Sequence, residues 1–339
     1  MNLISLLKKK NNKILFTTPS HMGKFILTHK FYQWYKHDIS EVDAYNPQEA
    51  LIKAEKNASK VYGTKYTKFL TNGSTSGVIA AILASGCKKI LIWDNAHPCH
   101  KNGAILSGAE IIEYSLPKDE ALGVYKAITI NKAEELISAN NADCIIITSP
   151  TYEGFAADVK QISGICHKNN IKLIVDEAHG ALYPFSNELP ESAVKYADYT
   201  VQSLHKTAGG INPTALLHSN DNNPEQALNM INTTSPSYPM LATIEANINF
   251  LSSKRGGKYI RNLINNIKSL NLPQYNDDIT KIILKKDGLS GYELSDILFN
   301  KYNIEDERTN EKSTMLLCGI GTNKNMLRKL KQALNKLID

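Results

Sequence analysis

Short, continuous apolar runs recur through the middle of the chain, and a polar turn follows each of them. The runs occupy residues 89–93, 144–148, 172–175, 199–202 and 215–218. Runs of this length without alternating polar positions predict strands that are buried on both faces of a sheet. Helix-like stretches such as residues 159–169 separate several of them. This alternation indicates an α/β fold with a mainly parallel central sheet covered by helices on both faces.

Both flanks of this region also carry periodic patterns. Residues 47–62 predict an amphipathic helix, because apolar side chains recur there every three or four positions and Gly63 is a typical helix end. After residue 250, the stretch SSKRGGK at 252–258 indicates a flexible break. Beyond it the pattern predicts strands at 281–284 and 314–318 and helices at 292–302 and 325–337. We therefore expect an N-terminal segment (1–40), a large domain (41–252) and a small C-terminal α/β domain (253–339).

Composition places the chain among ordinary globular proteins. Its 339 residues are 42% hydrophobic and 21% charged. The longest apolar stretches are far shorter than the roughly 20 residues that a membrane helix needs, so no membrane span is expected. The N-terminus shows no secretory pattern, and five cysteines without paired spacing favour reduced thiols. These features predict a cytoplasmic protein.

The charge pattern argues against nucleic acid as a partner. The net charge of +6 comes from lysines spread along the chain, and the four arginines all follow residue 254. Binding to a phosphate backbone usually needs a clustered basic face.

Candidate chemistry is expected in the turns that follow the strands, because ligands of open α/β sheets bind at the carboxyl ends of the strands. The turn TNGSTSG (71–77) precedes a helix-like run, so its backbone N–H groups and hydroxyls suit a phosphate. It lacks the lysine of a P-loop. An ordinary serine-rich helix cap is the alternative.

The turn DNAHPCH (94–100) contains two histidines. A histidine at this position can stack on a flat ring, ligate a metal or cap a turn, and in isolation His97 and His100 would most often be structural. A zinc site with Cys99 fits no standard four-ligand spacing, so no metal is expected.

Two further turns supply a carboxylate and an amine. Asp176 directly follows a buried apolar run, so it needs a facing cation or donor, unless it merely caps the turn. We expect Glu177 to point elsewhere and to be solvated or ion-paired. In SLHKT (203–207), Lys206 lies beside Ser203 and His205, and a lysine with a lowered pKa can act as a nucleophile. A phosphate cup, an imidazole, a buried carboxylate and an amine together suit pyridoxal 5′-phosphate.

Seven stretches of the sequence resemble the fold-type-I pyridoxal-phosphate decarboxylases of ornithine, lysine and arginine. They are TPSHMGK (18–24), TNGSTSG (71–77), NAHPCHKNGAILSGAEIIEY (95–114), TSPTYEGFAADV (148–159), VDEAHGA (175–181), SLHKT (203–207) and TTSPSYPMLATIEAN (233–247). They occur in the order of that family and span residues 18–250. The resemblance implies a fold-type-I transferase architecture, similar to aspartate aminotransferase, and a shortened family member.

The resemblance also implies a role for each matching residue. Lys206 would form the Schiff base with the cofactor, Asp176 would pair with the pyridine nitrogen, and His97, which lies eleven residues before Gly108, would stack on the ring. Other matching positions would complete the cofactor site: Ser74, Thr75 and Ser76, Ala178 and His179, and Ser203 and His205. Thr234 and Ser235 would reach the active site of a neighbouring subunit, which implies a homodimer with shared active sites.

The expected activity is decarboxylation of a basic amino acid (lysine, ornithine or arginine) to its amine. Departures from the family concern the substrate: Pro98 replaces a common lysine, and Glu305 or Glu307 is a candidate contact for a substrate amine. One alternative is another reaction on the same cofactor, such as aminotransfer, with Arg255, Arg261 or Arg308 holding a carboxylate. A non-catalytic relative that binds a partner or a diamine is the other.

Overall fold

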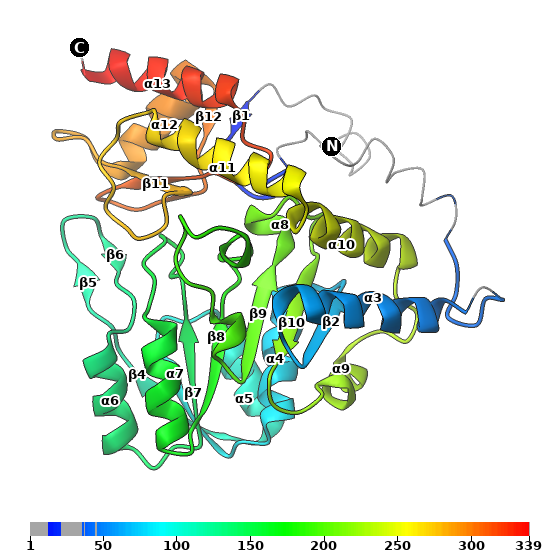
Figure 1. The fold of residues 1–339 in the computed structure, drawn as a ribbon. Helices are drawn as coiled ribbons and strands as arrows, with labels where there is room; N and C mark the ends of the chain where they lie inside the picture. The colour runs from blue at the N-terminus through cyan, green and yellow to red at the C-terminus, as the bar shows by residue number, and fades with distance from the viewer. Residues whose placement is uncertain (1–12, 22–35, 37, 45, 339) are drawn as a thin grey trace, which may run out of the picture.

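A seven-stranded sheet forms the centre of the molecule (Figure 1). The computed structural model describes residues 13–21, 36, 38–44 and 46–338. Across the sheet the order is β2-β10-β9-β8-β7-β3-β4. The strands are β2 (Tyr66–Leu70), β3 (Lys89–Trp93), β4 (Glu110–Tyr114), β7 (Cys144–Thr148), β8 (Lys172–Asp176), β9 (Tyr199–Ser203) and β10 (Ala215–Ser219).

The expected mainly parallel sheet is confirmed. Strands β4, β3, β7, β8 and β9 pair in parallel, whereas β10 is antiparallel to both of its neighbours. In β10, Ala215 pairs with Leu70 at the end of β2 and with Ser203 at the end of β9. Strands β2 and β9 therefore point the same way, and the turns that follow them emerge at the same edge of the sheet.

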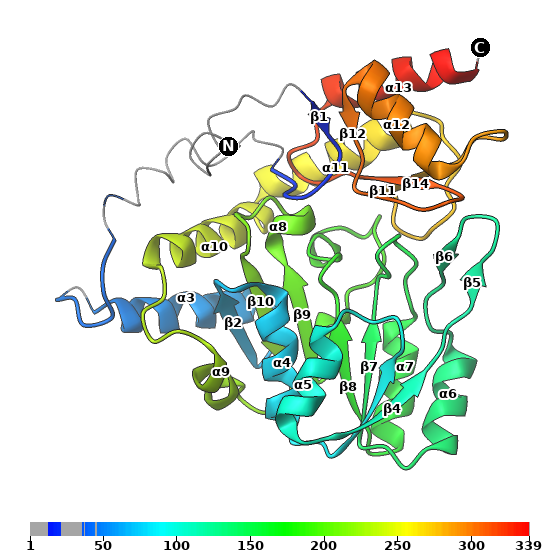
Figure 2. The same ribbon diagram turned by 180° about the vertical axis from the view of Figure 1, so that it is seen from behind.

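Alternate residues of each apolar strand pack on opposite faces. Ile90, Ile146 and Ile174 pack on one face in a core with α4 (Gly73–Ser85), α5 (Cys99–Ser107) and α9 (Glu225–Ile231). Leu91, Ile145 and Leu173 pack on the other face with α6 (Ile130–Ala139) and α7 (Val159–Lys168). Figure 2 shows α4 and α5 in front of the sheet and α6 and α7 behind it. Burial on both sides explains the absence of polar alternation in these runs.

The remaining part forms a smaller layer above the carboxyl ends of the strands (Figure 1). Its three-stranded sheet has the order β11-β14-β13. Its elements are α11 (Lys254–Lys268), β11 (Lys281–Leu284), α12 (Gly291–Tyr302), β12 (Ile304–Glu305), β13 (Arg308–Thr309), β14 (Thr314–Leu317) and α13 (Lys324–Ile338). Strand β1 (Ile14–Leu15) pairs in parallel with β12 and thus joins this layer.

The expected flexible break at 252–258 is wrong. Helix α10 (Tyr238–Leu251) is followed almost at once by α11, whose N-cap Ser253 accepts a hydrogen bond from the backbone of Gly256. A Cβ on Gly256 would lie 2.1 Å from the carbonyl oxygen of Phe250, so the glycine permits a close approach of the two helices.

One continuous hydrophobic cluster connects the two layers. It contains Phe16, Ala58 of α3 (Pro47–Tyr62), Leu216, Ile264 and Leu316. The division at 40/41 and 252/253 stays a prediction.

Candidate active site

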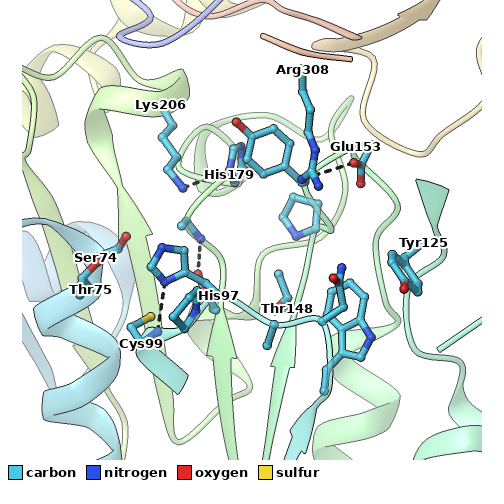
Figure 3. Close-up of a pocket in the computed structure, with 18 of the residues that line it drawn as sticks. Ser74, Thr75, His97, Cys99, Tyr125, Thr148, Glu153, His179, Lys206 and Arg308 are labelled. Carbon is cyan, nitrogen blue, oxygen red and sulfur yellow. Dashed lines mark hydrogen bonds and ion pairs between the residues drawn. The ribbon is translucent and has the colours of Figure 1, made fainter. Parts of the chain in front are cut away.

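A cavity of about 830 Å³ opens at the carboxyl ends of the central strands, beneath the small layer. Side chains from the turns after β2, β3, β7, β8 and β9 line it, together with the hairpin β5 (Lys118–Asp119) and β6 (Val124–Tyr125) and residues of β13. Figure 3 shows Lys206, His179 and His97 facing this space, with Ser74 and Thr75 at one end and Glu153, Arg308 and Tyr125 at the other.

Asp176 ends β8 and is buried in the floor of the cavity. Its Oδ2 lies 2.9 Å from Nε2 of His100, and its Oδ1 accepts a hydrogen bond from the backbone N–H of Ala178. Burial acts to raise the pKa of this carboxyl, but the His100 contact and the charge of Lys206 hold it below its ordinary value. The structure therefore keeps an ionised carboxylate where a cationic ring nitrogen can pair with it.

Lys206 lies in the short helix α8 (Leu204–Thr207), directly after β9. Its Nζ lies 3.0 Å from Nε2 of His179. Burial lowers the pKa of the amine more than Asp176 and Glu307 raise it. Burial also lowers the pKa of His179, so that its ring is neutral, and its Nδ1 has no partner among the described residues. These surroundings favour the neutral, nucleophilic form of the amine.

The first turn of α4 forms the end of the cavity that was expected to hold phosphate. Ser74 and Thr75 line it, and Ser203 reaches it indirectly, by donating a hydrogen bond of 2.8 Å to the Ser74 hydroxyl. Ser76 does not line the cavity, because its hydroxyl donates to Asn72 and to the carbonyl of Gly73. The helix start and the hydroxyls of Ser74 and Thr75 suit a dianion.

His97, Ala178 and His205 all line the cavity, as expected. The Nδ1 of His97 accepts a hydrogen bond from the backbone of Cys99, which fixes the ring orientation. His205 donates through Nδ1 to the carbonyl of Thr214. Burial lowers the pKa of both rings.

Three other candidates lie apart from the cavity. Thr234 and Ser235 are exposed in the segment between α9 and α10 and do not line it. Glu307 accepts hydrogen bonds of 2.6 Å each from Thr17, the backbone of Thr18 and Tyr152. The carboxylate of Glu307 is therefore already hydrogen-bonded within the protein. Residues 22–24 of the 18–24 match lie outside the described residues.

The expectation that Glu177 is solvated or ion-paired is wrong. Its side chain points away from the cavity and is 1% exposed. It accepts hydrogen bonds from Ser192, the backbone of Ala193 and Gln202. Burial raises its pKa to about 8.

Comparison with known proteins agrees with this geometry. The family model for the Orn/Lys/Arg decarboxylase major domain matches residues 3–283. The chain belongs to the Orn/Lys/Arg decarboxylase family. Members of this family are pyridoxal-phosphate-dependent carboxy-lyases, so the chain is an amino-acid decarboxylase by family.

Individual proteins show how far the similarity extends. Arginine decarboxylase of Bacillus anthracis is 30% identical, over 97% of this chain and 74% of that protein. The constitutive lysine decarboxylase of E. coli is similar in structure, with a TM-score of 0.71 and 20% identity over 85% of this chain and 51% of that one. An alanine–glyoxylate aminotransferase from Nostoc matches with a TM-score of 0.69 and 12% identity over 92% of both chains. The fold is thus fold type I.

The residues present fit pyridoxal phosphate, the cofactor of this family. A buried carboxylate, an amine with a lowered pKa and a hydroxyl-lined helix start face one cavity, and the unpartnered Nδ1 of His179 is a further buried polar atom there. The ring nitrogen would pair with Asp176, the aldehyde would meet Lys206, and the phosphate would lie at Ser74 and Thr75.

Several site residues were not assigned a cofactor or substrate role from the sequence. His100 lies one helical turn beyond His97, and only the packing of α5 against β8 explains its contact with Asp176. Tyr152 and Glu153 lie in the matched stretch 148–159 but had no role assigned there, and the hairpin residues Lys118 and Tyr125 lie outside the matched stretches. From the sequence, Arg308 is only a candidate carboxylate ligand for aminotransfer. The described residues contain no helix that is both long and apolar enough to cross a membrane.

Proposed function

We propose that this chain decarboxylates a basic amino acid (lysine, ornithine or arginine) to the corresponding amine. The observation that carries the proposal is that the Asp176 carboxylate and the Lys206 amine face the same cavity beside a helix start lined with hydroxyls. The names of the family and of the similar arginine and lysine decarboxylases support the substrate class.

Each side chain has a task in this reaction. When bound, the cofactor supplies the electron sink for the pair left behind by departing carbon dioxide. Asp176 keeps the proton on the ring nitrogen, because its ionised form is stabilised by His100. Lys206 would hold the cofactor through its Nζ, and the substrate α-amine would take its place on the same carbon, which leaves the lysine amine beside the substrate. His179 lies 3.0 Å from that amine and is placed to exchange its proton.

A direct test combines two measurements on the purified protein with pyridoxal phosphate. Carbon dioxide and amine are measured across lysine, ornithine, arginine and neutral amino acids. In Lys206→Ala, the visible absorption of the lysine-bound cofactor and the release of carbon dioxide should disappear together, because no other described amine lies at this position. Lys101→Ala, at an exposed lysine paired with Glu113, is the control. Turnover by the Lys206 variant would refute the assignment.

We also propose a cytoplasmic homodimer. Thr234 and Ser235 are exposed and outside their own cavity, which is what a contribution to a neighbouring active site requires. All five cysteines are free thiols, in keeping with a reducing compartment. Sedimentation of the loaded protein tests the dimer, and a monomer with full activity would contradict it.

Aminotransfer is a second candidate, because Arg308 lines the cavity and guanidinium groups bind carboxylates well. Arg255 and Arg261 lie on α11 and do not line it. Formation of a keto acid without carbon dioxide in the same assay would favour this reaction.

A further inference from the structure

Glu153 stands out in the charge pattern of the cavity. Among the described lining residues, the cationic side chains are Lys118, Lys206 and Arg308, whereas the acidic ones are Asp176 and Glu153. Asp176 is already committed to His100 and faces the place of the ring nitrogen. A cationic group that enters the end of the cavity near Arg308 and Tyr125 can therefore pair with the carboxylate of Glu153.

The Glu153 carboxylate is poorly compensated. Its side chain is 12% exposed, and burial raises its pKa. Apart from its own backbone N–H, its partner in the described structure is the Arg308 guanidinium, whose NH1 lies 3.6 Å from Oε1. That distance is longer than a hydrogen bond. A buried carboxylate without a hydrogen-bonded cation is stabilised by any cation that can approach it more closely.

Arg308 is a displaceable partner. Its side chain is 51% exposed, and its guanidinium rests 4.6 Å from the centre of the Tyr152 ring. The guanidinium can therefore leave Glu153 for solvent, and at 3.6 Å it makes no hydrogen bond that would hold it there. Its geometry shows that a planar cation fits between the Tyr152 ring and the Glu153 carboxylate.

A continuous path joins this place to the reactive amine. Lys206 contacts His179, and the His179 ring lies 4.5 Å from the Tyr152 ring. The Tyr152 hydroxyl donates to Glu307, which holds the ring in position. In Figure 3, Glu153 and Arg308 lie across the cavity from Ser74 and Thr75. An extended substrate side chain that starts at Lys206 can follow these rings to Glu153.

We propose that Glu153 binds the distal ammonium or guanidinium group of the substrate, and that this group displaces the Arg308 guanidinium from its place over Tyr152. Glu153 is then the residue that determines specificity for a basic side chain. The inference rests on the proposed function, because it assumes an amino acid held at Lys206.

The test uses amines that differ only in the distal group. Protein loaded with pyridoxal phosphate is titrated by calorimetry with pentylamine, 1,5-diaminopentane and 4-aminobutylguanidine. The native protein should bind both dications at least ten-fold more tightly than pentylamine. In Glu153→Gln this preference should fall to about two-fold or less, whereas Arg308→Gln should keep or increase it, because a competing cation is removed.

Controls distinguish a role of Glu153 in binding the distal cation from loss of folding and from failure of the proposed decarboxylation. Glu135→Gln and Arg328→Gln change exposed residues on α6 and α13 and should keep the native preference. Equal melting temperatures of Glu153→Gln and native protein exclude misfolding. A native preference near one, or an unchanged preference in Glu153→Gln, overturns the inference even if carbon dioxide is released from basic amino acids. If no carbon dioxide is released, the proposed function fails, and the amine titration still decides the role of Glu153.

Discussion

At the scale of single residues, hydrogen bonds decide which buried carboxyl groups are ionised. Asp176 and Glu177 are neighbours in sequence and both are buried, yet the pKa of Asp176 is lowered and that of Glu177 is raised to about 8. Asp176 has a histidine and a nearby lysine, whereas Glu177 has neutral donors only. Opposite faces of one strand end thus hold an anion and a neutral acid.

His100 is expected to position Asp176 and to keep it ionised. A hydrogen bond to a charged group contributes about 1.5–3 kcal/mol, so His100→Leu should lower kcat/KM by roughly ten-fold or more. The pKa of Asp176 should rise, and the acid limb of the pH profile should therefore move to higher pH. His167→Leu, which removes an exposed histidine paired with Asp198, provides the control. An unmoved acid limb would show that His100 serves packing alone.

Glu177 should make the stability of the fold depend on pH. Its pKa is about 8 in the folded protein, above its ordinary value of 4.5, so the folded state binds the proton more tightly. The stability gained from the protonated form is complete below about pH 4.5 and is lost as the pH rises through about 8. Glu177→Gln should remove this loss. The melting temperature of the variant, relative to the native protein, should increase from pH 5 to pH 9; a constant difference would contradict the assignment.

From the sequence, the site residues that directly follow apolar strands could be predicted. Asp176 and Lys206 follow such runs, so their meeting at one sheet edge could be predicted. Glu153 and His100 could not be assigned in this way, because their place in the site depends on how a loop and a helix pack. The burial of Glu177 likewise depends on Ser192 and Gln202, which are distant in sequence.

At the scale of elements, the pattern located both the continuous apolar strands and the amphipathic helix at 47–62, which is α3. Strands β3 and β7 begin and end where the pattern predicts. The edge strands β2 and β4 were missed, because each contains polar residues that interrupt the apolar run. The start of α11 was mistaken for a break because two consecutive glycines are typical of flexible segments.

Those two glycines should respond in opposite ways to the same substitution. A Cβ on Gly256 would lie 2.1 Å from the Phe250 carbonyl oxygen, whereas one on Gly257 would meet only the end of Arg261, at 3.5 Å. Gly256→Ala should destabilise the protein by about 1–3 kcal/mol through overpacking. Gly257→Ala should stabilise it by about 0.5–1 kcal/mol, the usual gain in a helix. Urea unfolding measures both, and equal effects would show that the close approach is absent.

At the scale of the whole molecule, residues 17–20 connect the small layer to helix α8, which carries Lys206. The backbone N–H of Ser20 donates to the carbonyl of His205, and its hydroxyl accepts from Gly209. Gly321 of the small layer donates to the carbonyl of Ser20. Glu307 extends this connection through Thr17 and Thr18.

Loss of the Glu307 carboxylate should therefore weaken the whole structure. In Glu307→Ala, donors on Thr17, Thr18 and Tyr152 lose their acceptor, and each unsatisfied donor that stays buried costs about 1–3 kcal/mol. The midpoint of urea unfolding should fall, and pyridoxal phosphate should dissociate faster. Glu311→Ala changes an exposed acid of the same layer and should leave both values unchanged. A midpoint equal to that of the native protein would contradict this view of Glu307.

The pairing of β10 with both β2 and β9 fixes how far apart the two ends of the proposed cofactor site lie. Because Ala215 is aligned with the last residues of β2 and β9 at once, backbone hydrogen bonds alone set the spacing between the α4 start and the Lys206 turn. The hydrogen bond between Ser203 and Ser74 also joins the two segments. Under the proposed function, the central sheet therefore fixes the distance between the phosphate end of the site and the lysine that would carry the cofactor.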